Sequence, residues 1–493
     1  MKTPLSFITI QSASAGPLLH WCSLSPAYLF IVTPNSFSGL PLTPTLLDNL
    51  NSLGYEEMTP IQAQSLPSIL AGRDLIARAK TGSGKTAAFG LGILQKLNPD
   101  IFSTQALVLC PTRELAEQVA NEMRRLARAI GNVKVLTVCG GTPIKPQIES
   151  LRSGAPILVG TPGRLLDHIG RGSVDLSAIG ILVLDEADRM IDMGFHDDIV
   201  NVVKTCPAKR QTLLFSATYP ENIRKSSARF LNRPLEVKLE LNHDASEIEQ
   251  HFYEIAPESR NAAVIQLLAH FRPVSTLAFC NTKAQCELLA NDLYSHGFST
   301  LALHGDLDQR EREDVLVQFS NQSCSVLVAT DVAARGLDIQ ALDAVINVDV
   351  TPDAEMYIHR IGRTGRRHEK GLALSLCAPN EMRWASLIEQ YQGQKLNWSK
   401  LASLRPSPGG RLRAPMVTLR IHGGKKDKLR PADLLGALTG QAGLNADQVG
   451  KINILNSVSF VALERKIAKE ALARLSNGAI KNRRFKMGFM PGN

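Results

Sequence analysis

Two short stretches of the chain combine residue types that handle phosphate groups. Gly82, Gly84 and Lys85-Thr86 lie between an apolar run and a helical pattern. Successive backbone N–H groups in such a turn can surround a phosphate, and the start of the following helix adds a favourable field. About a hundred residues later, an apolar run ends in Asp185-Glu186. This carboxylate pair can hold a hydrated cation and activate water, so the two stretches together predict a nucleoside triphosphate site.

Alternating apolar runs and helical patterns indicate the elements that position these residues. Short β-branched runs alternate with helical segments over 70–218, and the alternation restarts over 276–376 after a polar stretch around 241–250. This pattern predicts two α/β lobes, each with a parallel sheet covered on both faces. Beyond residue 415 the order β-α-β-β-α, with a short final strand near Arg484–Met487, predicts a small α+β domain of the RNA-recognition type.

The composition of the chain indicates where its domains begin and end. We expect the first lobe over 34–240, the second over 245–395, a linker over 400–415 and the small domain over 416–493. Residues 401–415 contain three Pro and two Gly among cationic residues, which favours a flexible connection. Residues 1–33 are expected to be a disordered or spurious extension. Their short apolar stretch only faintly resembles a secretion signal.

Charge and cysteine content narrow the class of protein. From residue 401 onward there are 17 Lys and Arg against 5 Asp and Glu, whereas the first 400 residues hold 38 against 41. Charge alone is compatible with a solvated basic surface or with a nucleic-acid anchor. The eight cysteines form no C-x-x-C pair, which argues against metal or disulfide roles and favours a reducing, cytoplasmic location. No apolar run reaches the ~18 residues of a membrane span, so no membrane partner is expected.

Further motifs occur in a fixed order along the chain. Pro111–Ala116, Thr161–Arg164, Ser216–Thr218 and His359–Arg366 accompany the Asp-Glu-Ala-Asp stretch at 185–188. This set resembles the DEAD-box family of ATP-dependent RNA helicases, and the resemblance covers the chain from about residue 36 to its end. The stretch 416–440 is similar to the RNA-binding domain of the DbpA branch of that family. The resemblance implies two RecA-like lobes, an RNA-dependent ATPase, and local unwinding of short RNA duplexes.

The resemblance assigns a nucleotide site that uses ATP and magnesium. Gln62 carries both a carbonyl and an amide and can therefore read adenine at two positions. The implied ATP-binding residues are Phe37, Gln62, Ala79, Lys80, Thr81, Gly82, Ser83, Gly84, Lys85, Thr86 and Asp338. The implied catalytic residues are Lys85, Asp185, Glu186, His359, Arg363 and Arg366. Thr86 and Asp185 would hold magnesium, largely through water, and Ser216 and Thr218 would couple hydrolysis to lobe movement. The arginines of 359–366, spaced three residues apart with glycines between them, are not typical of packing.

RNA contacts follow from the same resemblance. The implied core contacts are Thr112, Arg113, Gly141, Thr161, Arg164, Thr282 and Thr330. In the small domain only Phe460 is aromatic within 459–463, so base stacking across its sheet is not expected. Contacts are assigned instead to Lys425, Lys426, Lys428 and Arg430. The DbpA branch implies a hairpin of large-subunit ribosomal RNA as partner and a role in 50S assembly intermediates, by a protein expected to be monomeric.

Two other functions share these motifs. An ATP-gated RNA clamp that does not unwind duplexes would have the same catalytic residues. A DNA translocase is disfavoured by Gln62 with Phe37 and by the Asp-Glu-Ala-Asp spelling. A DNA translocase is distinguished from an RNA helicase by comparing ATPase stimulation by RNA and by DNA of the same sequence. An RNA clamp is distinguished by the kinetics of RNA release after hydrolysis.

The first prediction concerns Glu186→Gln. The substitution keeps size and hydrogen bonding but removes the charge that activates water. ATP and RNA should still bind while turnover collapses, as measured by steady-state ATPase and equilibrium binding. Near-normal ATPase activity would contradict the role assigned to Glu186.

Overall fold

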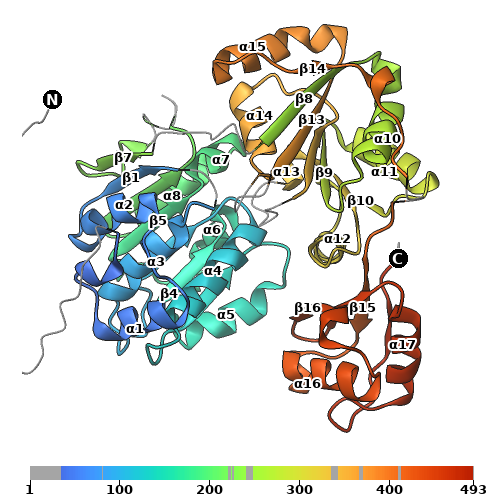
Figure 1. Ribbon diagram of the computed structural model, residues 1–493. Coiled ribbons are helices and arrows are strands. Elements are labelled where there is room, and N and C mark those ends of the chain that lie inside the picture. The colour runs from blue at the N-terminus through green and yellow to red at the C-terminus, as the bar shows by residue number, and fades with distance from the viewer. Residues whose placement is uncertain are drawn as a thin grey trace, which may run out of the picture.

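The computed structural model describes residues 35–79, 82–219, 224, 227–239, 248–334, 342–365, 370–408 and 412–491. The chain forms two parallel-sheet lobes and a small antiparallel domain, which confirms the predicted fold class (Figure 1). The extension 1–33 lies outside the described residues, as do Lys80, Thr81, Asp338 and Arg366. None of the helices in the described ranges is long and apolar enough to cross a bilayer.

Lobe 1 contains a seven-stranded parallel sheet in the order β3-β4-β2-β5-β6-β1-β7. Its strands are β1 (Leu75–Arg78), β2 (Ala106–Leu109), β3 (Val135–Val138), β4 (Ile157–Gly160), β5 (Ile181–Asp185), β6 (Gln211–Ser216) and β7 (Leu235–Lys238). Its helices are α1 (Pro44–Ser52), α2 (Pro60–Leu70), α3 (Lys85–Lys96), α4 (Arg113–Ala127), α5 (Ile144–Arg152), α6 (Pro162–Gly170), α7 (Ala187–Asp192) and α8 (His196–Thr205). Strands β2, β4, β5 and β6 are buried along their whole length. Burial on both faces explains why they are continuous apolar runs in the sequence.

Lobe 2 repeats this arrangement with the strand order β10-β11-β9-β12-β13-β8-β14. Its strands are β8 (Ile248–Glu254), β9 (Thr276–Cys280), β10 (Thr300–Leu303), β11 (Val326–Thr330), β12 (Ala344–Asn347), β13 (Gly371–Cys377) and β14 (Trp398–Ser399). Its helices are α10 (Arg260–Phe271), α11 (Lys283–Ser295), α12 (Gln309–Ser320), α13 (Asp331–Ala334), α14 (Ala354–Ile361) and α15 (Met382–Gln392). Position by position, β2, β3 and β4 of lobe 1 correspond to β9, β10 and β11 of lobe 2.

Lobe 2 extends beyond residue 395, the end expected from composition. β14 pairs with β8, and Leu401, Leu404 and Leu412 pack into the lobe 2 core. The connection after residue 400 is therefore held against the lobe where it is described, although its Pro and Gly content indicated flexibility. β8 was also missed, because it begins inside the polar stretch around 241–250 and carries polar residues near the sheet edge.

The C-terminal domain has a four-stranded antiparallel sheet in the order β16-β17-β15-β18. Its strands are β15 (Met416–Ile421), β16 (Val449–Ile454), β17 (Ser459–Glu464) and β18 (Met487–Phe489), and its α-helices are α16 (Pro431–Gly436) and α17 (Ala468–Asn477). Val417, Leu419 and Ile421 of β15 form a core with residues of both helices. The alternate residues of β15 face the other side of the sheet.

Helix α3 begins with Lys85 and Thr86, the last residues of the phosphate-binding stretch, and packs closely on α2. A Cβ atom added at Gly92 of α3 would lie 2.1 Å from Cγ2 of Ile69 in α2. The Ile69 side chain is branched at Cβ and fully buried, so it has little freedom to move away. Glycine at this position therefore allows the two helices to approach.

We expect Gly92→Ala to lower the free energy of unfolding of lobe 1 by about 1–3 kcal/mol, because overpacking outweighs the higher helix propensity of alanine. The matched control is Gly170→Ala in α6, where an added Cβ atom meets nothing within 4 Å. Denaturant unfolding of both variants checks the prediction, and equal stability of the two would contradict it.

Candidate functional site

The phosphate-binding stretch connects the end of β1 to the start of α3. Gly82 and Gly84 have φ of 82° and 95°, a region that favours glycine. Lys85 is buried, and its Nζ donates a hydrogen bond to the carbonyl oxygen of Ala79 at 2.9 Å. The Ala79 N–H in turn donates to the Ser216 carbonyl at the end of β6, at 3.0 Å. Ser83 and Thr86 lie in the same turn and first helical residues.

Gln62 joins the start of α2 to this stretch. Its Oε1 accepts from the Thr59 N–H at 2.9 Å, and its Nε2 donates to the Gly84 carbonyl at 3.1 Å. Because a side-chain amide has two acceptor lone pairs and two N–H donors, one of each remains for a base. A Cβ at Gly84 would lie 2.5 Å from Nε2 of Gln62, so glycine is required here for space as well as for φ. Phe37 is buried and packs edge-on against Tyr55, with ring centroids 6.2 Å apart.

Asp185 and Glu186 lie at the carboxyl end of β5 and are both buried. Burial raises the pKa of Asp185 to about 7, opposed by nearby Lys85. Its Oδ1 has no hydrogen-bond partner among the described residues. Glu186 adopts φ 52° and ψ 53°, a left-handed conformation that is rare outside glycine, and its Oε2 lies 3.3 Å from Nε of Arg189. Backbone strain of this kind is often found at functional sites.

Asp188 holds the Ser216–Thr218 stretch, a role that sequence reasoning missed. Its Oδ2 accepts from the Ala217 N–H at 3.2 Å, the Thr218 N–H at 3.0 Å and the Thr218 hydroxyl at 3.1 Å. The Asp188 N–H donates to Oγ of Ser216. Burial raises the pKa of Asp188, but Arg189 and these donors outweigh it and the pKa is lowered overall. The carboxylate is therefore charged and ties the end of β6 to α7.

His359 of lobe 2 reaches this group of lobe 1 residues. Burial, then the charge of Arg189, lowers its pKa to about 4, so the imidazole is neutral at neutral pH. Asp188 and Glu186 also act on it electrostatically, which places His359 close to the carboxylates. Arg363 is buried and lines a small cavity with Arg189 and His359.

The expectation that the arginines of 359–366 are not packing residues is wrong for Arg360. It is fully buried, and its Nε and Nη2 donate to the two carboxylate oxygens of Asp331 at 2.7 and 2.6 Å. Nη1 donates to the Asp349 carbonyl, and the guanidinium lies 5.1 Å from the centre of the Phe279 ring. Nη2 also donates to Oδ1 of Asn281 at 3.1 Å, so Arg360 holds the segments after β9, β11 and β12 together inside lobe 2.

The expected RNA contacts follow equivalent strands in the two lobes. Thr112 follows β2 and Thr282 follows β9, and each hydroxyl caps the next helix by accepting an N–H three residues on, at 3.2 Å. Thr161 follows β4 and is the N-cap residue of α6, but its side chain makes no capping hydrogen bond; Thr330 ends β11, the equivalent strand. The carboxyl ends of parallel strands lie at one edge of a sheet, which is where ligands bind in such folds.

Two of the expected arginines are held by the loop after β3. A Cβ at Gly141 would lie 2.0 Å from Nη2 of Arg113, so Arg113 packs directly on that glycine. Arg164 donates to the Thr142 carbonyl from Nη1 at 3.0 Å and from Nη2 at 3.1 Å. The structure therefore brings the loops after β2, β3 and β4 together.

An ion pair across the lobes was not predicted. Nε of Arg312 in α12 lies 3.3 Å from Oε1 of Glu114 in α4, and both side chains are mostly buried. Arg113 and Glu313, the neighbouring residues, lie 4.0 Å apart. Local sequence carries no signal for these pairs, because their members are about two hundred residues apart.

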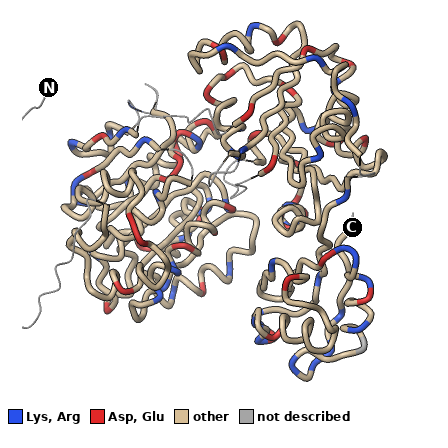
Figure 2. Tube along the Cα trace, viewed as in Figure 1, with Lys and Arg blue, Asp and Glu red and all other residues tan. Residues whose placement is uncertain are grey.

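Two basic loops meet on the C-terminal domain. Lys425, Lys426, Lys428 and Arg430 are exposed on the loop between β15 and α16. The loop before β18 lies beside it, since Nζ of Lys481 donates to the Lys428 carbonyl at 3.0 Å and Arg483 lies 3.9 Å from Asp427. Figure 2 shows that Lys and Arg positions recur along the chain trace of this domain.

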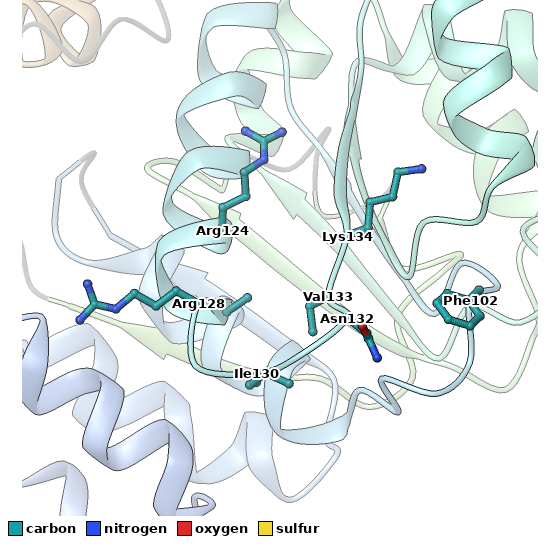
Figure 3. Close-up of a pocket in the computed structure, with 8 residues that line it drawn as sticks. Phe102, Arg124, Arg128, Ile130, Asn132, Val133 and Lys134 are labelled. Atoms are coloured by element: carbon teal, nitrogen blue, oxygen red, sulfur yellow. The ribbon is translucent and has the colours of Figure 1, made fainter. Parts of the chain in front are cut away.

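An open hollow of about 560 Å³ lies away from all of these residues, between the end of α4 and the loops before β2 and β3. Figure 3 shows Phe102 across the hollow from Arg124 and Arg128, with Arg128 pointing away from it. The Arg128 side chain donates hydrogen bonds to Asn49 and Ser52, and the Lys134 side chain donates hydrogen bonds to Ser150 and Ser153. The hollow lies at the amino ends of the strands and takes no part in the arrangement described above.

Together, the fold and the site define a two-lobed nucleoside triphosphatase with an appended RNA-recognition-type domain. Sequence models match in the same order: the DEAD/DEAH box helicase domain over residues 59–226, the helicase conserved C-terminal domain over 259–368, and the DbpA RNA binding domain over 418–488. The ATP-dependent RNA helicase DbpA of Escherichia coli is 51% identical over 442 residues, which cover 90% of this chain and 96% of that protein.

Further relatives share the helicase lobes. The DEAD-box ATP-dependent RNA helicase CshA of Bacillus subtilis is 41% identical over 78% of each chain. The structure of Saccharomyces cerevisiae Dbp5 bound to RNA and ADP BeF3 is 33% identical, with a TM-score of 0.68, and the match covers 74% of this chain and 96% of that one. The chain belongs to the DEAD-box family of ATP-dependent RNA helicases and carries a DbpA-type RNA-binding domain. It is accordingly an RNA-dependent ATPase.

A pair of substitutions separates the two described arginines of the 359–366 stretch. Arg360→Lys keeps the charge but loses the planar fork and most of its hydrogen bonds, so we expect lobe 2 to lose about 1–3 kcal/mol of unfolding free energy. Arg363→Gln should change stability less and lower ATP turnover by about 10³–10⁵-fold. Thermal unfolding and RNA-stimulated ATPase assays check both. Equal effects of the two substitutions on stability would contradict the distinction.

Proposed function

We propose that this helicase unwinds short duplexes beside a hairpin of large-subunit ribosomal RNA, and that its C-terminal domain selects the hairpin. The observation that carries the proposal is the meeting of the exposed loops 425–430 and 481–486 on one domain. Phosphate contacts dominate nucleic-acid affinity, so adjoining basic loops suit a folded RNA. The 51% identity to the Escherichia coli protein and the matching RNA-binding domain support the same reading.

In this proposal the two lobes divide the chemistry of ATP. Lys85 and the N–H groups of the Gly82–Thr86 stretch bind phosphate, while Gln62 and Phe37 receive adenine. Glu186 orients or deprotonates the attacking water, and the neutral imidazole of His359 helps to order it. Arg363 reaches the γ-phosphate from lobe 2, and the same role is proposed for Arg366. Asp338 is proposed to contact the ribose, and the remaining residues assigned to ATP above, Ala79, Lys80, Thr81 and Ser83, are proposed to line the phosphates.

The residues present fit a hydrated magnesium ion. Asp185 offers a buried carboxylate oxygen without a partner among the described residues, and burial alone disfavours its charge. Within the described ranges no group of three or more His, Cys, Asp or Glu side chains is placed to hold a metal, so most ligands would be water and phosphate oxygens. Thr86 would supply one hydroxyl. When bound, magnesium neutralises phosphate charge.

The RNA strand would lie along the loops after β2, β3 and β4 of lobe 1 and after β9 and β11 of lobe 2. Thr112, Thr161 and Thr282 bring hydroxyls and helix N-termini to this edge, with Arg113, Gly141, Arg164 and Thr330 beside them. Contacts of this kind go to the sugar-phosphate backbone and carry no sequence information. Selection of one hairpin must then come from the C-terminal domain, and we propose that the protein acts as a monomer in the cytoplasm during 50S subunit assembly.

We expect Lys425→Ala with Lys426→Ala and Lys428→Ala to weaken binding of a hairpin-bearing ribosomal RNA fragment. The slope of log affinity against log salt should fall by about one unit per lost phosphate contact. The matched control replaces exposed Lys466 and Lys469, beside and within α17, together with Arg474. ATPase stimulation by unstructured RNA should be unchanged in both proteins. Hairpin affinity that falls equally in the control would show the charge to be only a solvated surface.

A further inference from the structure

The C-terminal domain is docked on lobe 2 through the face of its sheet that carries no helices. Thr418 of β15 is fully buried, and its hydroxyl accepts from Nδ2 of Asn321 at 3.2 Å and bonds Oγ of Ser323 at 2.5 Å. The Met416 N–H donates to the Gln322 carbonyl at 3.3 Å. The strand β15 therefore lies against the turn that follows α12.

Arg420, two residues further along β15, faces α12 itself. Its Nη2 donates to both carboxylate oxygens of Asp314, at 2.6 and 2.8 Å, and both side chains are more than three-quarters buried. The guanidinium also lies 5.4 Å from the centre of the Phe460 ring. On β16, at the edge of the same sheet beyond β17, Nζ of Lys451 donates to Oγ of Ser320 at 2.6 Å.

The connection between the domains is held at several points. The Ser407 hydroxyl donates to the His270 carbonyl at 2.6 Å, and the Ala414 N–H donates to Oγ of Ser299 at 3.3 Å. From the other side, Nε of Arg465 donates to the Ala414 carbonyl at 2.6 Å. The described parts of the connection thus hold the C-terminal domain near lobe 2 in a restricted range of positions.

The docked face contains Phe460, the aromatic residue that an RNA-recognition sheet would offer to a base. Phe460 is 2% exposed and is not part of the core beneath α16 and α17. The contact with lobe 2 therefore occupies this face, whereas the basic loops 425–430 and 481–486 remain exposed.

Helix α12 carries contacts to both of its neighbours. Arg312 and Glu313 face Glu114 and Arg113 of lobe 1, and Asp314, the next residue, holds Arg420. A helix is stiff over such a distance, so α12 fixes the position of the C-terminal domain relative to the first turn of α4, the helix of lobe 1 that follows β2.

We propose that Asp314, Arg420 and Thr418 form a latch that fixes the distance between RNA held by the C-terminal domain and the cleft between the lobes. The latch makes the enzyme unwind duplexes at one spacing from the bound hairpin. These residues are positioning residues and do not touch ATP. The proposal rests on the proposed function, because it needs RNA on the C-terminal domain.

The test uses the full chain with Arg420→Gln, Asp314→Asn, and both together. The probes are RNAs that join a large-subunit ribosomal hairpin to a short duplex through single-stranded spacers of increasing length. Wild-type protein should show a maximum of unwinding rate at one spacer length. In each variant the maximum should flatten and the rate at the best spacing should fall about tenfold, because a rigid attachment is replaced by a loose tether.

Three readouts separate positioning from general damage. Hairpin affinity and ATPase stimulation by unstructured RNA should stay within twofold of wild type. The double variant should lose no more than either single variant, since all three break one contact. The matched control is Arg474→Gln, which breaks an ion pair with Glu470 on α17, in the same domain but away from lobe 2. Lys451→Ala changes an exposed residue at the rim of the contact with lobe 2 and should partially flatten the maximum of unwinding rate against spacer length. This variant replaces the buried ones in the test if they fold poorly.

A direct measurement accompanies the kinetics. Fluorophores at Leu387→Cys in α15 and Lys469→Cys in α17 report the distance between the domains, since the seven described native cysteines are buried. One narrow distance in wild type that broadens in the latch variants supports the proposal. Variants that keep both the narrow distance and the sharp spacing maximum overturn it.

Failure of the proposed function gives a different result. In that case wild-type protein itself binds the ribosomal hairpin no more tightly than an unrelated hairpin. The latch proposal is then tested by the distance measurement alone. A distance distribution that broadens in the latch variants supports the proposal, and a distribution that stays narrow overturns it.

Discussion

The carboxyl ends of parallel strands lie at one edge of a sheet. The functional site depends on this constraint in both lobes, because each lobe contributes one such edge. In lobe 1 the phosphate-binding stretch follows β1, while Asp185 and Ser216 are the last residues of β5 and β6, and these three strands are neighbours on one half of the sheet. The loops after β2, β3 and β4 form the other half. Because lobe 2 has the same strand order, its loops divide in the same way. Ligands of such folds bind at the carboxyl ends of the strands, so both halves of each edge are placed to contact a ligand.

Short-range contacts connect the groups at the nucleotide end. Gln62 bonds the Gly84 carbonyl, Lys85 bonds that of Ala79, and Ala79 bonds Ser216. Asp188 then holds Ala217 and Thr218 on the far side of Ser216. Each element around the phosphate position is therefore attached to the next, and His359 of lobe 2 lies against the last of them. Movement of one lobe against the other must alter the environment of these carboxylates.

The C-terminal domain divides its surface between two partners. One face of its sheet is held by lobe 2 through Thr418 and Arg420, and its exposed loops carry a large part of the positive charge that distinguishes the last fifth of the chain. A buried charge or hydroxyl that loses its partner is costly, so these contacts favour this arrangement of the two domains over ones that leave the same groups unpaired. The attachment of this domain is thus specific, although the connecting segment has the composition of a loose linker.

Sequence alone determined the class of fold, most of the strands, and the residues expected at the nucleotide. Buried parallel strands are continuous apolar runs, and glycines with a lysine at a strand-to-helix turn are a local pattern. It did not determine β8, whose polar residues lie near a sheet edge, or the packed course of the connection after residue 400. Nor did it reveal the left-handed backbone of Glu186, the buried fork of Arg360 on Asp331, or the pairs Arg312–Glu114 and Arg420–Asp314. Those features depend on partners brought close by the tertiary fold. The sequence shows that an arginine is present and charged. Only the tertiary structure determines whether its guanidinium group contacts a carboxylate, a ligand or water.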